Sequence, residues 1–457
     1  MIEGLKPYAE YKESGSKWLG AVPAQWEVRN LRTLISKRAE RDRPDLPLLS
    51  VAREKGVFVR SMTDADENHN VIPEDLTNYK VARAGNLVIN KMKAWQGSMG
   101  IAPCDGIVSP AYFVFDFRIA NHAFGQRLLR SKPYVAHFGQ ASDGVRVGQW
   151  DLSIPGMRQI PVLVPSDDEQ AAIVAFLDHA NRKIDGFIRS KRKLIGLLNE
   201  QKQTIIHRAV TRGLHPDVPL KPSGIPWLGD IPNHWEMSRA CRVFRQVTRY
   251  IATGDEPKMS MSRHYGLIRS SELSNRAAQA ATSIKFSVCI PGDLVLNKYQ
   301  AHNGLFGAAI EKGLITSNYS VFKPLNSACA AYFAALFASP AYRGEFRMRC
   351  QGVGDGMMPL YSDAFLKTPT IVPPTAEQQS IVAHLIQATK TVTETIARTE
   401  REIALMQEYR TRLTADLVTG KLDVREAAAH LPAPPAAATA EPASDERLEE
   451  IETEETE

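Results

Sequence analysis

Two long stretches of the sequence carry a seven-residue repeat of apolar positions, interrupted once by a polar residue. The first stretch runs from Pro165 to Leu214, and Lys191 interrupts its repeat. The second stretch begins at Pro373 and keeps the same register 208 residues later, with Thr399 in the place of Lys191. The repeating positions are Leu177, Ile184, Leu198 and Ile205 in the first stretch and Leu385, Val392, Met406 and Leu413 in the second. This spacing predicts two helices that each present an apolar stripe to a partner.

A second row of apolar positions widens the stripe of the first stretch. The row consists of Ile173, Ala180, Phe187 and Leu194. Asp167 and Asp168 supply helix-start chemistry just before the pattern begins. Each helix of about forty residues would be roughly 60 Å long, well above the usual helix length of about 12 residues. Because one chain holds both stripes in matching register, we favour antiparallel pairing within the chain over a homodimeric coiled coil.

The segments that flank these stretches indicate an internal duplication. Residues 11–28 and 220–237 share a motif 209 places apart, and residues 84–102 align with 291–309 at an offset of 207. The alternating apolar residues of this second pair predict strands that lead into glycine-containing loops. Residues 45–83 and 252–290, in contrast, show little resemblance. The pattern indicates one scaffold that carries two different surfaces.

The shared motif of residues 11–28 is rich in tryptophan, glycine and proline. Its repeated positions are Ser14, Gly15, Trp18, Leu19, Gly20, Pro23, Trp26 and Glu27. We expect the tryptophans to pack this lead-in segment onto the domain that follows, in preference to stacking on nucleic-acid bases.

Proline-rich segments and a change of composition divide the chain. The predicted fold class is α+β, with two similar α/β domains, an antiparallel coiled coil of the two long helices and a pseudo-twofold internal repeat. The predicted boundaries are 1–165 and 215–373 for the domains, 166–214 for the first helix, 374–427 for the second helix with a C-terminal segment, and 428–457 for a disordered tail rich in Ala, Pro and Glu.

Charge and composition limit the class of protein. The chain has a formal charge of +5, but the last 27 residues hold nine acidic groups and one basic group, which leaves +13 for residues 1–430. Such an excess favours a polyanionic partner, although plain solubility would also explain it. The longest apolar run, residues 328–338, is too short to span a bilayer, and the chain opens on no signal peptide. We therefore expect a cytoplasmic protein without membrane contact.

The sequence offers no convincing active site. The five cysteines are scattered, and the histidines have no metal-ligand spacing, so we predict neither a disulfide framework nor a metal site. The segments 109–112 and 339–342 faintly resemble the adenine-holding motif of amino-methyltransferases but lack its second proline. Asp293 lacks the second carboxylate of a nuclease site, and the glycine-rich run 352–356 lacks the context of a dinucleotide site.

Taken together, these features resemble the specificity subunit of a Type I restriction-modification system over essentially residues 11–427. The most specific parts are the proline-to-helix segments PVLVPSDDEQAAIVAFLD and PTIVPPTAEQQSIVAHL and the ending RLTADLVTGKLDV. The acidic tail departs from that pattern.

The resemblance implies a non-catalytic subunit that recognises double-stranded DNA. Each variable domain would be a target-recognition domain for one half of a bipartite, asymmetric sequence, and the helices would set the gap and dock two methyltransferase subunits. Those subunits would bring S-adenosylmethionine, and a motor-nuclease subunit would use ATP and Mg²⁺, so this chain itself needs no cofactor. A helical scaffold that assembles proteins without reading DNA is the alternative, and an independent nuclease or methyltransferase is a third hypothesis that the missing motifs disfavour.

Direct readout of bases needs side-chain donors and acceptors on loops that reach a groove, with Lys and Arg on phosphates. The divergent segments supply Arg53, Lys55 and Arg60 in the first domain and Arg263, His264 and Arg269 in the second. Lys91 and Lys298 occupy the same position in the two copies. This position suits either a phosphate contact or a solvated strand end. Arg146 is a further loop candidate.

Overall fold

The structure, a computed structural model, describes residues 5–60, 75–146, 149–250, 256–262, 266–273, 286–350 and 358–432. Most of the predicted acidic tail therefore lies outside the described residues. The chain divides into two compact units. Unit 1 contains residues 1–191 and 401–440, and unit 2 contains residues 192–400 and 441–457.

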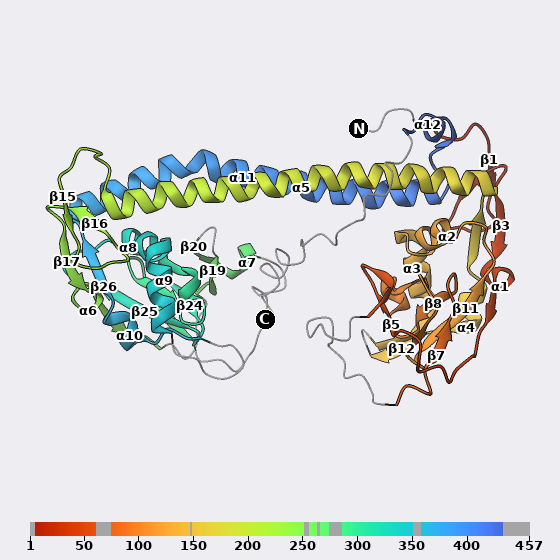
Figure 1. Cartoon of the computed structure of the whole chain (residues 1–457), viewed down its shortest axis with the longest axis horizontal. Coiled ribbons are helices and arrows are strands. Elements are labelled where there is room, and N and C mark those ends of the chain that lie inside the picture. The colour runs from red at the N-terminus through yellow and green to blue at the C-terminus, as the bar shows by residue number, and fades with distance from the viewer. Residues whose placement is uncertain are drawn as a thin grey trace. The chain divides into compact units, whose positions relative to one another are not determined.

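The chain forms two long helices, as the heptad pattern predicted (Figure 1). They are α5 (Asp167–Arg212) and α11 (Thr375–Val418), with 46 and 44 residues. Three carboxylates, Asp167, Asp168 and Glu169, lie in the first turn of α5, where they complement the positive end of the helix dipole. In the part of the chain that the structure describes, no helix is long and apolar enough to cross a membrane.

The buried side of these helices differs from the strict heptad that the sequence suggested. Phe187 and Leu194 of the second predicted row are 37% and 38% exposed, whereas Ile188 is 6% exposed. Leu177 and Ile188 are buried eleven residues apart, and so are Leu385 and Ile396. An α-helix has 3.6 residues per turn, so a seven-residue repeat drifts by about 20° per heptad unless the helix supercoils, and an eleven-residue repeat stays on one side. Of the eight pairing positions, Leu177, Ile184, Leu385, Val392 and Leu413 are buried, and Leu198, Ile205 and Met406 are half-buried.

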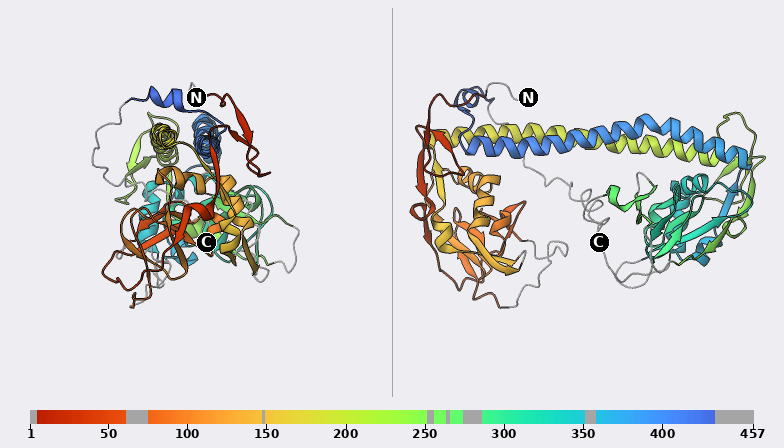
Figure 2. Two further views of the ribbon diagram at one scale, coloured as in Figure 1. Left: turned by 90° about the vertical axis from the view of Figure 1, so that its right-hand side faces the viewer. Right: turned by 180° about the vertical axis from the view of Figure 1, so that it is seen from behind.

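Within unit 1, the first half of α5 lies beside the last half of α11 (Figure 2). Lys191 of α5 pairs with Glu402 of α11 at 2.7 Å, and Asp185 pairs with Arg410. Asp185 precedes Lys191 in α5, whereas its partner Arg410 follows Glu402 in α11. The two segments therefore run antiparallel here. Lys191 also lies over the ring of Phe187, with its Nζ 5.2 Å from the centroid. The charge that interrupts the repeat is therefore paired.

The centre of unit 1 is a four-stranded antiparallel sheet of order β4-β11-β8-β9. Its strands are β4 (Ile35–Lys37), β8 (Leu87–Asn90), β9 (Met99–Ile101) and β11 (Tyr112–Phe117). Two-stranded pairs surround it: β1 (Tyr11–Glu13) with β2 (Ala21–Pro23), β3 (Glu27–Asn30) with β14 (Pro161–Val164), β5 (Leu49–Ala52) with β6 (Gly56–Val59), β7 (Lys80–Ala82) with β10 (Gly106–Val108), and β12 (Ser142–Arg146) with β13 (Gln149–Leu152). The helices are α1 (Leu31–Leu34), η1 (Ala94–Gln96), α2 (His122–Leu129), α3 (Lys132–Gln140) and α4 (Ile154–Arg158).

Unit 2 contains a four-stranded antiparallel sheet of the corresponding order, β18-β25-β22-β23. Its strands are β18 (Phe244–Val247), β22 (Leu294–Asn297), β23 (Phe306–Ala308) and β25 (Tyr319–Pro324). The surrounding pairs are β15 (Leu220–Pro222) with β16 (Asp230–Pro232), β17 (Glu236–Arg239) with β26 (Pro369–Val372), β19 (Met259–Ser262) with β20 (Gly266–Arg269), and β21 (Ser287–Cys289) with β24 (Gly313–Ile315). The helices are α6 (Ala240–Val243), α7 (Ser270–Leu273), η3 (Ala301–Asn303), α8 (Ala330–Phe337), α9 (Pro340–Arg349) and α10 (Ser362–Leu366); α12 (Arg425–Ala429) belongs to unit 1.

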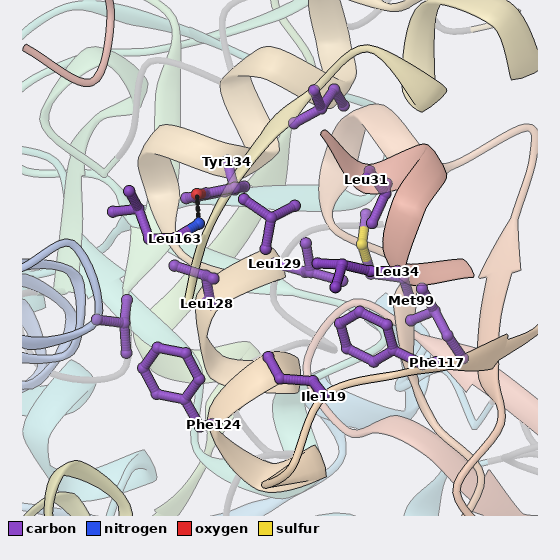
Figure 3. Packing of buried hydrophobic residues seen from close by; sticks show 14 of the residues in the cluster. Leu31, Leu34, Met99, Phe117, Ile119, Phe124, Leu128, Leu129, Tyr134 and Leu163 are labelled. Atoms are coloured by element: carbon purple, nitrogen blue, oxygen red, sulfur yellow. Dashed lines mark hydrogen bonds between the residues drawn. The ribbon is translucent and has the colours of Figure 1, made fainter. Parts of the chain in front are cut away.

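The core of unit 1 lies between its sheet and the helices α2 and α3 (Figure 3). Phe124, Leu128 and Tyr134 of these helices are fully buried, and the Tyr134 hydroxyl accepts a hydrogen bond from the Leu163 N–H at 3.1 Å. Burial raises the pKa of Tyr134, so the phenol stays neutral. In unit 2, Tyr342 binds the Ile371 N–H at 3.4 Å in the same manner.

The tryptophans of the lead-in segments pack onto these cores, as the sequence predicted. Trp26 and Trp235 are fully buried. Trp18 meets Tyr134 edge-on at 5.0 Å between ring centroids, and Trp227 meets Tyr342 at the same distance. Their packing therefore attaches the lead-in segment to each domain.

A glutamine near the start of each long helix fixes the preceding strand and the domain to that helix. The amide of Gln170 donates to the Pro165 carbonyl at 2.9 Å and accepts from the Asn121 N–H at 3.0 Å. Gln378 makes the same two contacts with Pro373 and Cys329, both at 2.8 Å. Both glutamines are almost completely buried. Each domain is therefore joined to its own helix by buried hydrogen bonds as well as by the chain.

Candidate nucleic-acid interface

The β5–β6 hairpin carries the first three candidates of unit 1. Arg53 and Lys55 lie in its turn, and Arg60 follows β6 directly. The Arg53 side chain approaches Glu54 at 3.5 Å, and the Lys55 Nζ lies 5.5 Å from the centroid of the Phe58 ring. The structure therefore brings these basic groups together on one hairpin, which is a geometry suited to a nucleic-acid groove.

The turn of this hairpin is held by a side chain from α2's C-terminal end. Arg130 donates from Nη2 to the carbonyl oxygens of Arg53 and Glu54 at 2.6 and 2.7 Å. Burial lowers the pKa of Arg130, yet an arginine remains charged at any physiological pH. Gly56 closes the turn at φ +74°, and a Cβ there would lie 3.0 Å from Arg130 Nη1. The turn is thus positioned before any ligand binds.

Lys91 follows β8, and Arg146 lies at the end of β12. The Lys91 ammonium pairs with Asp151 at 2.8 Å, and its carbonyl accepts from the Leu152 N–H at 2.8 Å. Lys91 therefore fixes strand β13 to the end of β8. Arg146 ends β12, and its backbone pairs with that of Gln149, while its side chain is not among the described groups.

In unit 2 the corresponding place is taken by the β19–β20 hairpin. Arg263 and His264 come between its two strands in the sequence and lie outside the described residues. Arg269 ends β20 and makes a two-pronged ion pair with Glu311, at 2.7 and 2.6 Å. This hydrogen bonding lowers the pKa of Glu311 and raises that of Arg269. Arg269 therefore presents a partly neutralised guanidinium.

Lys298 follows β22 as Lys91 follows β8. Its N–H donates to the Asn318 carbonyl at 3.0 Å, and its carbonyl accepts from the Leu360 N–H at 2.8 Å. Burial lowers the pKa of its ammonium. Among the described residues, this ammonium has no carboxylate partner such as Asp151 provides for Lys91. The carbonyls of the two shared lysines thus accept equivalent hydrogen bonds, whereas their ammonium groups have different charge environments.

The two hairpins have more in common than the sequence comparison suggested. Both have four-residue strands, and the second hairpin follows the first at an offset of 210 residues. Arg53 corresponds to Arg263, and Gly56 at φ +74° corresponds to Gly266 at φ +72°. This shared Arg-x-x-Gly spacing was missed in the sequence comparison, because the hairpins align at an offset of 210 residues and the neighbouring segments at 207.

A shared glycine positions both hairpins on their sheets. A Cβ on Gly100 of β9 would lie 2.9 Å from the Val57 nitrogen, and one on Gly307 of β23 would lie 2.9 Å from the Leu267 nitrogen. Real Cβ atoms do not approach backbone nitrogen so closely, so only glycine fits. These glycines, which the sequence alignment identified, are the part of the scaffold that holds the divergent surface.

Asp293, which faintly suggested a nuclease site, has a structural role, and the glycine-rich run 352–356 lies outside the described residues. Asp293 is buried, pairs with Arg249 at 2.5 Å and accepts from the Ile290 N–H at 2.9 Å. Asn86, at the corresponding position, likewise accepts from the Arg83 N–H at 2.9 Å. Within the described ranges, no three His, Cys, Asp or Glu residues form a group able to hold a metal ion.

Comparison with known proteins identifies the fold. No protein-family model and no curated protein match the sequence. A solved chain from a study titled "Structural basis underlying complex assembly and conformational transition of the type I R-M system" is similar with a TM-score of 0.58 and 16% identity, over 87% of this chain and 98% of that chain.

Two further solved chains match with lower scores. The HsdS subunit from Thermoanaerobacter tengcongensis has a TM-score of 0.42 and 17% identity, over 87% of this chain and 96% of its own. The S subunit of a Type-I restriction-modification system from M. genitalium has a TM-score of 0.31 and 10% identity, over 86% and 96%. The first similarity confirms at the level of the fold the resemblance that the sequence motifs predicted: this chain has the fold of a protein of a type I R-M system.

Proposed function

We propose that this chain is the sequence-specific DNA-recognition subunit of a Type I restriction-modification complex and is not itself an enzyme. The observation that carries the proposal is the fold shared with a chain of the type I R-M system over nearly the whole length of both. The two hairpins add independent support, because Arg53 lies in a turn that Arg130 holds in unit 1, and the sequence has Arg263 between the corresponding strands of unit 2.

Each unit would recognise one half of a bipartite target. Arg53, Lys55 and Arg60 would contact one half-site, and Arg263, His264 and Arg269 the other, with Arg146 as a further contact. The sequences of the two hairpins differ while their backbones correspond, which is the arrangement needed to recognise two unrelated half-sites. Lys91 and Lys298 suit phosphate contact, which positions a protein without selecting a sequence.

The paired helices would act as a coiled-coil ruler and as the docking site for two methyltransferase subunits. Antiparallel helices with one recognition domain at each end of the repeat would give the pseudo-twofold arrangement that the duplicated sequence indicates. S-adenosylmethionine would enter with the methyltransferase subunits, and ATP and Mg²⁺ with motor-nuclease subunits. These chemistries require no catalytic residue of this chain. We expect the complex to act in the cytoplasm.

The test is a map of methylated adenines in cells that express this chain with its methyltransferase partner. We expect one bipartite motif that disappears when the gene is deleted. Inserting four residues after Gln201, about 6 Å of helix, should widen the gap by one or two base pairs at roughly 3.4 Å each and leave both half-sequences unchanged. Altered half-sequences would contradict the ruler.

The alternative is a scaffold that assembles proteins and does not bind DNA. Salt dependence separates the two functions, because a protein that contacts several phosphates loses affinity steeply between about 50 and 200 mM salt. A scaffold would show no affinity for a duplex at either concentration.

A further inference from the structure

The end of α5 in unit 2 borders a cavity of about 380 Å³. The cavity lies between the last turns of α5 and the segment that leads from Gly213 to β15, which Figure 1 shows leaving the helix end. The residues that line it are His207, Arg208, Thr211, Arg212, Gly213, Leu214, His215, Pro216, Val218 and Leu220. The size suits a few side chains of a peptide better than a folded domain.

The lining combines basic and apolar residues. His207, Arg208, Arg212 and His215 supply cationic or titratable groups, and none of the lining residues is acidic. Burial, and secondarily the charge of Arg212, lowers the pKa of His207. Its Nδ1 is buried and has no hydrogen-bond partner within the described part of the chain. A buried ring nitrogen of this kind normally has a partner, so the hydrogen bonding of His207 at the end of α5 is incomplete.

Unit 1 shows how the equivalent position is completed. Thr419 near the end of α11 donates its hydroxyl to the Ala415 carbonyl at 2.6 Å, as Thr211 does to His207 at 2.6 Å. By the 209-residue offset of the lead-in segments, Lys6 stands where His215 stands in unit 2. The chain's C-terminal segment covers this position in unit 1.

The covering segment is α12 together with the residues around it. Asp423 donates its N–H to the Lys6 carbonyl at 2.7 Å, and Glu426 pairs with the Lys6 ammonium at 3.6 Å. Arg425 lies 5.4 Å from the centroid of the Tyr8 ring. The apolar residues Leu422, Ala427 and Leu431 pack against the core of unit 1. In unit 1 this position is therefore covered by a segment that contributes apolar side chains and the Glu426 carboxylate.

The residues at this position are more basic in unit 2, at the end of α5, than in unit 1, at the end of α11. At an offset of 208 residues, His207 and Arg208 replace Ala415 and Asp416. Arg212 is an additional basic residue just before Gly213, whose φ of +75° matches that of Gly420 at +76°. Asp416 lies near two cationic partners in unit 1, Arg412 and Lys421. A peptide segment that occupies the unit 2 cavity must therefore be more acidic than α12.

We propose that this cavity is a docking site for an acidic peptide segment of a partner protein. The segment has a small apolar face against Leu214 and Val218 and carboxylates that pair with Arg208 and Arg212. The apolar lining and the peptide that fills the equivalent position in unit 1 favour a protein partner over nucleic acid. The site is separate from the hairpins and goes beyond the proposed DNA recognition.

The test uses the full-length protein and two fluorescein-labelled peptides. The first has the sequence of residues 421–432, KLDVREAAAHLP. The second carries glutamate at the positions of Arg425 and His430, KLDVEEAAAELP. Fluorescence anisotropy should show saturable binding of the acidic peptide with at least tenfold higher affinity than the first, weakened at high salt.

The variant Arg208→Gln/Arg212→Gln should lose at least tenfold in affinity for the acidic peptide. The control Arg189→Gln, at an exposed arginine of α5 outside the cavity, should change it less than twofold. Both cavity arginines are exposed, and a thermal scan checks that the variants fold. If the double variant unfolds, Arg208→Gln alone repeats the measurement.

Equal binding by wild type and the cavity variants would overturn the proposal, as would equal affinity for the two peptides. A tenfold loss of affinity for a 30-base-pair duplex in the same variants would assign the cavity to DNA and also overturn it. Unchanged duplex binding with weakened peptide binding would support it.

Discussion

The strands of the β5–β6 hairpin of unit 1 correspond to those of the β19–β20 hairpin of unit 2, but different side chains hold the two hairpins in place. In unit 1, Arg130 binds two carbonyls of the turn. Position 338, which corresponds to Arg130 in unit 2, holds alanine. There the hairpin is fastened through the Tyr319 hydroxyl, which accepts from the Met261 N–H at 3.2 Å, and through the Arg269–Glu311 pair. Backbone packing on a shared glycine is therefore the constant feature, and the anchoring side chains vary.

The largest expected effect comes from the shared glycines. Gly100→Val or Gly307→Val places side-chain atoms against a backbone nitrogen 2.9 Å away, and we expect a loss of about 3 kcal/mol in the stability of the affected unit. Hydrogen exchange of the hairpin amides in each unit measures this loss. The control Gly186→Ala, where a Cβ would meet nothing within 4 Å on α5, should stabilise by up to about 1 kcal/mol. Full protection in both glycine variants would show that the close approach does not position the hairpins.

The second effect tests whether the hairpins recognise separate half-sites. Arg53→Ala/Lys55→Ala should weaken duplex binding about tenfold to thirtyfold, and each lost phosphate contact should lower the salt slope by about 0.9. Arg263→Ala/His264→Ala should do the same for the other half. Selection of bound duplexes from a random pool checks this, because each double variant should relax one half-site only. Relaxation of both half-sites by one variant would contradict the separation.

The third effect sharpens the difference in anchoring. Arg130→Ala removes two charge-assisted hydrogen bonds, and we expect about 1–2 kcal/mol of local destabilisation of the β5–β6 turn. Hydrogen exchange of residues 53–57 should increase, while residues 266–269 should keep their protection. Ala338→Gly in unit 2 is the matched control and should leave both hairpins unchanged. Equal loosening of both would mean that the anchors are not independent.

The smallest effect separates the two shared lysines. Lys91→Ala breaks a half-exposed ion pair with Asp151, which is worth about 0–1 kcal/mol, and should change duplex affinity less than about twofold. Lys298→Ala should reduce affinity about threefold and lower the salt slope by about 0.9, because no described carboxylate neutralises its ammonium. Titration at three salt concentrations measures both slopes. A larger effect for Lys91 would reverse this assignment.

Sequence alone determined the long helices, the strands of the two scaffolds and the packing role of the tryptophans. Periodicity and repetition are local properties of a chain, and the heptads from Leu177 and from Leu385 needed no tertiary information to predict helices. Gly100 and Gly307 lie in the segments that the sequence aligned, 84–102 and 291–309, but only the structure shows that a side chain cannot fit there. The candidates Arg53 and Arg263 were found because they lie in the divergent segments, and their contacts with DNA are predictions.

Tertiary structure decided which face of each helix is buried and which charges remain available. Ile188 replaces Phe187 in the stripe because a helix of 3.6 residues per turn does not keep a seven-residue row on one side. Arg269 and Lys91 are paired with Glu311 and Asp151, which lie 42 and 60 residues away in the sequence. Such pairs depend on how strands assemble, and no local pattern records that. The sequence therefore specifies the elements, and their packing determines which side chains can meet a ligand.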